Sequence, residues 1–148
     1  GRRCPCGSTG CLELYASATG LMRYARGILG QGSGSSLEAR MRDKKLDPRM
    51  IEEEALRGDP LSMHIYTQVS TWLGMGVANL VNLFNPQAIV FAGGLSRAHR
   101  LIFPVVKKVV HERAMEGLDK GIRYLVIQDH EKTPALGAAR VAIDSIKY

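Results

Sequence analysis

The cysteines of this 148-residue chain all fall within one short stretch, CPCGSTGC, from Cys4 to Cys11. A single disulfide would use two of the three thiols and leave the last one unpaired. Thiolates are strong zinc ligands, and a structural zinc site is closed by four thiolate or histidine ligands. Gly7 and Gly10 allow so short a loop to turn back on itself, which would bring the three sulfurs together. The spacing therefore favours a metal-binding loop over three free thiols, which would be prone to oxidation.

This stretch supplies only three of the four ligands that a closed zinc site needs. The four histidines lie much further along the chain, and each by itself is expected to be an ordinary polar residue: His64, His99, His111 and His130. The fourth ligand is then either one of these histidines, brought back by the fold, or a residue upstream of Gly1. Because the chain starts with glycine and not methionine, we expect a processed or truncated form.

Composition and charge exclude several classes of protein. Hydrophobic residues make up 45% of the chain and charged residues 23%, as in ordinary globular proteins. No run approaches the roughly 18 apolar residues of a membrane helix, and the start of the chain has no apolar core typical of a secretory signal. We therefore expect a cytoplasmic protein with no membrane partner. The net charge is +6, but the basic residues are spread among acidic ones without interleaved aromatics, which argues against nucleic-acid binding by this segment.

The first half of the chain is predicted to be helical. Apolar residues at helical spacing over 14–29 indicate an amphipathic helix, capped by Ser17 or Thr19. The pairs Asp47-Pro48 and Asp59-Pro60 each place a capping aspartate before a proline at the first helical position. They predict a short helix over 47–58 and a long one over 59–85. The predicted buried face of the long helix consists of Leu61, Ile65, Val69, Trp72, Leu73, Gly76, Leu80 and Leu83.

The second half is predicted to alternate strands and helices. AIVFAGG (88–94) and RYLVIQ (123–128) are short apolar runs typical of buried parallel strands. Helices are expected over 100–117 and 133–148, the latter with Thr133 as its N-cap. This alternation is typical of an α/β domain.

Two short features are candidates for ligand contacts. Gly93-Gly94 follows a predicted strand, where ligands approach the backbone in open α/β sheets, but a tight turn without a ligand explains it equally well. Glu13 follows soon after Cys11. A carboxylate held by a metal loop suits hydrogen bonding to vicinal hydroxyls. A glutamate at a helix N-terminus is also stabilised by the helix dipole, and from the residues alone this second interpretation is preferred.

Three segments resemble the ROK family (repressors, open reading frames, kinases). CPCGSTGCLE resembles its Cys-x-Cys-Gly-x-x-Gly-Cys-x-Glu signature at every fixed position, and LVNLFNPQAIVFAGGLS and TPALGAARVA resemble two later segments in the same order. The resemblance implies an α/β, actin-like ATPase fold (ribonuclease H-like), helix-rich with a small parallel or mixed sheet. Residues 1–148 would form most of the C-terminal lobe: a zinc loop (1–13), a helical part (14–85) and an α/β part on the nucleotide side (86–148).

The resemblance also implies an activity and a set of site residues. ROK sugar kinases transfer a phosphoryl group from ATP, with Mg²⁺, to a hexose or N-acetylhexosamine, so a glucokinase-like parent enzyme is expected. Carried over by residue, the resemblance implies that a structural zinc ion is bound by Cys4, Cys6 and Cys11 and that Glu13 binds the sugar. It also implies that the nucleotide is bound by Gly93, Gly94 and Leu95. Residues Ala135–Ala139 would belong to the helix near the interdomain hinge. The family's histidine zinc ligand, first phosphate loop and catalytic aspartate would lie upstream. The chain by itself is therefore expected to be inactive.

Two other functions fit the same residues. ROK repressors keep the zinc motif and sugar pocket and add an upstream helix-turn-helix, in which case DNA becomes a partner. The intact AGGLS favours a kinase, since a repressor needs no ATP site. The third reading is a zinc-stapled interaction module. ROK proteins commonly form dimers, so a homodimer is expected, with part of the long apolar helix as an interface.

Overall fold

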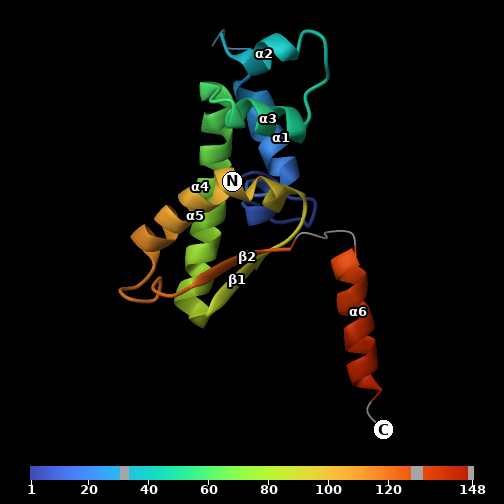
Figure 1. Cartoon of the computed structure of the whole chain (residues 1–148), viewed down its shortest axis with the longest axis vertical. Coiled ribbons are helices and arrows are strands. Elements are labelled where there is room, and N and C mark those ends of the chain that lie inside the picture. Colours follow the sequence, from blue (N-terminus) through green and yellow to red (C-terminus); the bar gives the residue numbers. More distant parts are fainter. Residues whose placement is uncertain (31–33, 128–131, 147–148) are drawn as a thin grey trace.

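The computed structural model describes residues 1–30, 34–127 and 132–146 and places one long helix at the centre of the molecule (Figure 1). The elements in order are η1 (Leu12–Leu14), α1 (Ala18–Ile28), α2 (Ser36–Arg40), α3 (Pro48–Leu56), α4 (Pro60–Phe84), β1 (Ala88–Phe91), η2 (Gly94–Ala98), α5 (His99–Arg113), β2 (Arg123–Val126) and α6 (Lys132–Ser145). The predicted order of a helical first half followed by alternating strands and helices is confirmed.

The two Asp-Pro pairs begin helices as predicted. Asp47 accepts a hydrogen bond from the backbone N–H of Met50 at 2.8 Å and begins α3, and Asp59 accepts one from the N–H of Ser62 at 2.9 Å and begins α4. The residue Asn85, in the left-handed conformation at φ 43°, ends α4 before Pro86. Ser17, and not Thr19, caps α1. These local signals set the start of each helix because the capping side chain satisfies an N–H that the helix cannot.

The core forms where α4 packs against α5, α3 and α1. Its fully buried side chains come from all four helices: Leu21, Ile51, Ile65, Val69, Val81, Ile102, Val106 and Val110. The predicted buried face of α4 is wrong at its C-terminal end, where Leu80 and Leu83 are 50% and 73% exposed. The helix turns the face with Gly74 and Val77 inward instead. A Cβ on Gly74 would lie 2.7 Å from the Cβ of Val109, so the missing side chain allows α5 to approach closely.

The two strands form a parallel sheet with Ala88 opposite Arg123 and Phe91 opposite Val126. One face is covered: the rings of Phe91 and Phe103 of α5 lie with centroids 4.9 Å apart. The other face carries Val90 and Leu125, which are 55% and 45% exposed. The prediction of strands buried on both faces is therefore wrong for the part of the chain that the structure describes. β1 is also shorter than predicted, because the chain turns at Gly93.

The last helix, α6, stands away from the other elements (Figure 1). It begins at Lys132, so the prediction of Thr133 as its N-cap is wrong. Its apolar side chains Leu136, Val141 and Ile143 are each at least 66% exposed. Among the described helices, none is both long enough and apolar enough to cross a membrane.

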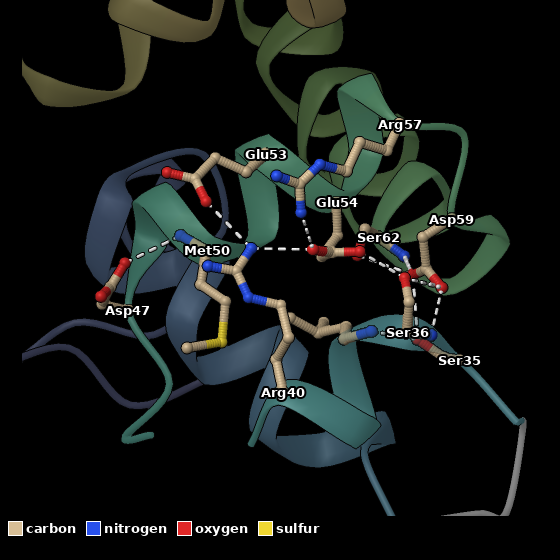
Figure 2. A network of polar contacts seen from close by, with 11 residues as sticks. Ser35, Ser36, Arg40, Asp47, Met50, Glu53, Glu54, Arg57, Asp59 and Ser62 are labelled. Atoms are coloured by element: carbon tan, nitrogen blue, oxygen red, sulfur yellow. Dashed lines mark hydrogen bonds and ion pairs between the residues drawn. The ribbon is translucent and has the colours of Figure 1, made fainter. Parts of the chain in front are cut away.

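A buried polar network joins α2, α3 and the start of α4 (Figure 2). Asp59 is 7% exposed and accepts hydrogen bonds from the Ser35 hydroxyl, the Ser36 N–H and both the N–H and the hydroxyl of Ser62, at 2.7 to 2.9 Å. The aspartate that caps α4 therefore also holds the segment that begins α2. This second role was not visible in the sequence, because Ser35 and Asp59 are far apart along the chain.

Glu54 of α3 is the second buried carboxylate of this network and is 2% exposed. One of its oxygens accepts from Arg40 at 2.7 Å and Arg57 at 2.8 Å, and the other accepts from the Ser36 hydroxyl. Two guanidinium groups thus compensate a carboxylate that has left water. Ser36 lies between Glu54 and Asp59 and links the two halves of the network.

We expect this network to make the protein less stable in acid. Hydrogen bonds from Ser36 and then Arg40 hold the pKa of Glu54 below its usual value. Burial raises the pKa of Asp59, but the hydrogen bonds from Ser62, Ser35 and Ser36 outweigh it and lower that pKa. A lowered carboxylate pKa contributes stability above the unfolded pKa of about 4, and this stability is lost as pH falls through the folded value.

Urea unfolding of the wild type and Glu54→Gln between pH 7 and pH 3 checks this expectation. The wild type is expected to be the more stable protein at pH 7, and the difference is expected to shrink as pH falls below about 5. A difference that stays constant across this range would show that the charge of Glu54 does not contribute to folding.

Candidate functional site

The three cysteines converge as the sequence predicts. The sulfurs of Cys4, Cys6 and Cys11 all lie within 4.8 Å of one another, and those of Cys6 and Cys11 are 3.6 Å apart. Sulfurs bound to a tetrahedral zinc ion at about 2.3 Å lie about 3.8 Å from one another. Gly7 and Gly10 both have positive φ, 92° and 78°, and allow the two turns of the loop. The donor set and its spacing therefore fit a zinc ion.

The thiols of Cys6 and Cys11 have different pKa values. A backbone hydrogen bond from Ser8, followed by hydrogen bonds with Cys4 and Cys11, lowers the pKa of Cys6 to about 7. Hydrogen bonds with Cys4 and then Cys6 raise the pKa of Cys11 to about 11. Cys6 is thus the first of the two to become a thiolate. The thiolate is the form that binds a metal, and a bound cation favours it.

No described histidine completes the metal set. The three described ones contact other residues: His64 bonds the hydroxyl of Tyr24, His111 pairs with Asp119, and His99 lies against the ring of Phe103. His130 lies outside the described residues. The described part of the chain therefore supplies three ligands at this loop.

Glu13 lies on η1, directly after the cysteine loop, and is exposed. Helix α1 begins only at Ala18, so Glu13 is outside its first turn, where a helix dipole acts. Glu13 lies instead in the first turn of η1, a 3-10 helix of only three residues, so a helix dipole contributes little to it. The carboxylate belongs to the turn that directly follows the cysteine loop.

Arg2 ties this turn to the cysteine loop. Its guanidinium donates to the carbonyl of Leu14 at 2.7 Å and lies 4.4 Å from the centre of the Tyr15 ring. Its backbone N–H donates to the Tyr15 hydroxyl at 2.9 Å. On the other side the turn rests on α1, because a Cβ on Gly20 would lie 2.7 Å from the carbonyl of Tyr15. Glu13 is thus presented by a turn held from both sides.

The Gly93-Gly94 turn opens into a cavity. Gly93 has φ 87° and ψ 178°, and its carbonyl accepts a hydrogen bond from the Ser96 hydroxyl at 2.8 Å. Gly94 and Leu95 line an open cavity of about 380 Å³, whose other walls come from α1, α3 and α4. The cavity therefore lies next to the residues that the sequence predicted to bind the nucleotide. Its remaining walls, among them Glu52 and Tyr66, were missed, because no motif links residues from four separate elements.

The two glycines of this turn are expected to respond differently to alanine. At Gly93 the positive φ makes any side chain unfavourable, and Gly93→Ala should lower the free energy of unfolding by about 1–3 kcal/mol. At Gly94 a Cβ meets no atom within 4 Å and φ is not positive, so Gly94→Ala should fold normally. Because Gly94 lines the cavity, the added methyl group should weaken nucleotide binding about tenfold if the nucleotide lies there. Thermal unfolding and calorimetric titration of both variants separate the two effects, and unchanged nucleotide affinity in Gly94→Ala would contradict this placement.

The helix-rich architecture with its small parallel sheet matches solved ROK sugar kinases, which have the actin-like ATPase fold. The model of the ROK family matches residues 1–145. The chain therefore belongs to the ROK family, as the resemblance implied.

The relatives of the chain include repressors and kinases. It is 35% identical over 141 residues to the DNA-binding transcriptional repressor Mlc of Escherichia coli (strain K12), covering 95% of this chain and 34% of the repressor. It is 35% identical over 112 residues to the glucokinase of Thermotoga maritima, covering 74% of this chain and 35% of the enzyme. The solved ROK family glucokinase of Streptomyces griseus, in complex with glucose and AMPPNP, has a TM-score of 0.82 at 29% identity and covers 95% of this chain and 47% of that one. The chain thus spans about a third of the length of these curated relatives.

Proposed function

We propose that this chain is the C-terminal lobe of an ATP-dependent sugar kinase that phosphorylates a hexose or an N-acetylhexosamine. The observation that carries this proposal is the cavity beside Gly94 and Leu95, at the turn that follows β1. In open α/β sheets, ligands bind outside the carboxyl ends of the strands. A repressor that responds only to sugar has no use for a nucleotide cavity at this place. The likeness to a glucokinase structure with a bound ATP analogue supports the same reading.

In this proposal each part of the site has one task. Glu13 accepts hydrogen bonds from sugar hydroxyls, and the zinc ion that Cys4, Cys6 and Cys11 would hold stabilises the loop that presents it. Gly93, Gly94 and Leu95 admit the nucleotide because the two glycines lack side chains. ATP would arrive with Mg²⁺, and phosphoryl transfer would depend on residues of the remainder of the parent protein.

The exposed apolar surface supports a larger parent. Val90 and Leu125 on the open face of the sheet, and Leu136, Val141 and Ile143 on α6, are all at least 45% exposed. A two-stranded sheet is marginally stable by itself, and large apolar side chains exposed together on one face of an element mark an interface. We propose that the rest of the parent protein covers these surfaces, with 1–13, 14–85 and 86–148 as successive parts of one lobe and a homodimer as the assembled form.

The test is an assay of sugar-dependent ATP consumption by the full-length protein. We expect turnover with a hexose or an N-acetylhexosamine, and we expect none from the isolated chain. Lack of activity with all common hexoses and N-acetylhexosamines would exclude the kinase function. Turnover by the isolated chain would contradict the assignment of catalysis to the rest of the protein. Full-length protein with Glu13→Gln is the matched control, since it should retain nucleotide binding and lose sugar affinity.

A sugar-responsive transcriptional repressor is the second candidate. The match to Mlc covers 95% of the chain, against 74% for the match to the Thermotoga maritima glucokinase. A repressor parent would have DNA as an additional partner and would bind sugar without consuming ATP. Sugar-dependent release of the full-length protein from its own promoter DNA, together with the absence of ATP consumption, would favour this function over the kinase.

A further inference from the structure

One buried hydroxyl in the cavity has no protein partner. Tyr66 of α4 is only 3% exposed, yet it lines the cavity beside Gly94. No described residue makes a hydrogen bond with its hydroxyl. In the described part of the chain, the fully buried side-chain polar atoms that lack a hydrogen-bond partner are Ser70 Oγ and His99 Nδ1. The Tyr66 hydroxyl also lacks a partner but is not one of these atoms, so part of its surface is accessible. Because Tyr66 lines the cavity, its hydroxyl is available to a molecule bound there.

A buried tyrosine hydroxyl normally finds a partner, because leaving it unpaired costs the hydrogen bond that it made with water. Even the half-buried Tyr24 has such a partner and bonds His64 at 2.9 Å. The Tyr66 hydroxyl has no partner among the described residues, and it lies at the wall of a cavity. Burial, and then the charge of Glu52, raise the pKa of the Tyr66 hydroxyl. It therefore stays protonated at neutral pH and can both donate and accept a hydrogen bond.

The walls around Tyr66 are suited to a flat ring. Leu21 of α1, Pro48 of α3 and Leu95 of η2 contribute apolar surface from three directions. The polar and charged residues of the lining are Asp47, Arg49, Glu52, Tyr66 and Arg97, and of these only Tyr66 is buried. The buried part of the cavity is therefore mainly apolar, as in sites that bury a heterocycle and contact its edge through a few polar groups. Glu52 lines the same cavity, acts electrostatically on Tyr66 and makes no hydrogen bond or ion pair with another described residue. A carboxylate can only accept hydrogen bonds, so this corner favours a ligand edge that donates them.

We propose that Tyr66, together with Glu52, determines which nucleobase this cavity binds, and that the pair selects a purine whose amino group faces them. The inference rests on the proposed nucleotide site and goes further by assigning base recognition to these two side chains. An exocyclic amino group carries two protons, one for the Tyr66 oxygen and one for the Glu52 carboxylate. A purine with a carbonyl at that position presents an acceptor to the carboxylate and is disfavoured. Tyr66 is thus a specificity-determining residue, and it takes no part in phosphoryl transfer.

The test uses the full-length protein with Tyr66→Phe, which removes the hydroxyl and keeps the ring. Calorimetric titration with ATP, GTP and the triphosphate of purine riboside, which lacks the amino group, gives the affinities. We expect the wild type to prefer ATP over purine riboside triphosphate about tenfold. Tyr66→Phe should reduce this preference without abolishing it, because Glu52 still accepts one amino proton, and its sugar affinity should stay unchanged. Glu52→Gln should narrow the preference for ATP over GTP. Tyr124→Phe is the matched control, because its ring contacts those of Phe91 and Phe103 at the sheet and does not line this cavity.

The outcomes separate this inference from the proposed function. If Tyr66→Phe and Glu52→Gln both discriminate among the three nucleotides as the wild type does, the inference is wrong and the nucleotide site stands. If the wild type binds none of them, the proposed function and this inference fall together. If Tyr66→Phe lowers the melting temperature and the sugar affinity as well, its hydroxyl is structural. The assignment of Tyr66 is then overturned, whatever Glu52→Gln shows.

Discussion

Replacing Asp59 by alanine is expected to lower the free energy of unfolding by about 3 kcal/mol. The loss of an N-cap costs about 1 kcal/mol by itself. The same change leaves the hydroxyls of Ser35 and Ser62 and the N–H of Ser36 without their acceptor in a buried place, and each unsatisfied donor adds about 1 kcal/mol. The relief of repulsion between Asp59 and the nearby Glu54 offsets part of this cost. Denaturation by urea at pH 7 measures the difference.

Asp47 provides a matched control for this prediction. It is also an aspartate N-cap followed by proline, but it is exposed and caps α3 through a bond to Met50. Asp47→Ala should therefore cost only about 1 kcal/mol, the value of a cap alone. Equal costs for the two substitutions would mean that the buried network adds nothing to the cap of α4. An intermediate variant, Asp59→Asn, keeps one oxygen acceptor and should fall between the two.

Replacing Cys11 by serine is expected to have the largest effect on the metal loop. Serine is a poor zinc ligand, and the loss of one thiolate should weaken zinc binding about hundredfold or more. Because Cys11 directly precedes η1, loss of the ion should also loosen the turn that carries Glu13. We expect less than one zinc ion per chain by metal analysis, and about tenfold weaker sugar binding by calorimetry if Glu13 contacts the sugar.

Two variants of the full-length protein separate these effects. Thr9→Ala changes an exposed side chain of the same loop that is no metal ligand, and it should keep both the zinc ion and the sugar affinity. Glu13→Gln should keep the zinc ion and lose sugar affinity. Full zinc content in Cys11→Ser would show that this thiolate is not a ligand. Normal sugar affinity in a zinc-free Cys11→Ser protein would show that the ion is not needed to position Glu13.

Local signals predicted the elements of this fold well, and their packing less well. The Asp-Pro pairs begin α3 and α4 because the capping side chain and the preset φ of proline act within one turn. The buried face of α4 was predicted wrongly near Leu80 and Leu83, because apolar residues outnumber polar ones in the C-terminal half of this helix and do not mark a single face. Only the docking of α5 at Gly74 selects the face that is buried.

The candidate site also contains residues that the sequence predicted and residues that only the packing revealed. The cysteines and Glu13 lie in one short stretch, so their spacing along the chain already implied their spacing in space. The cavity is different, because Leu21, Glu52, Tyr66 and Leu95 come from α1, α3, α4 and η2. No local pattern links these residues, and Tyr66 by itself looks like one more core residue of a long helix.

The sequence by itself determined the convergence of the three cysteines, the starts of the helices, the order of strands and helices and, through its motifs, the ROK family. These features depend on contacts within a few residues, where the covalent chain limits the possible geometries. The tertiary structure decided which face of α4 is buried, how Ser36 joins Glu54 and Asp59, and where Tyr66 meets the cavity beside Gly94. These features depend on how whole helices pack, and packing is set by the combined shape of many side chains that are distant in the chain.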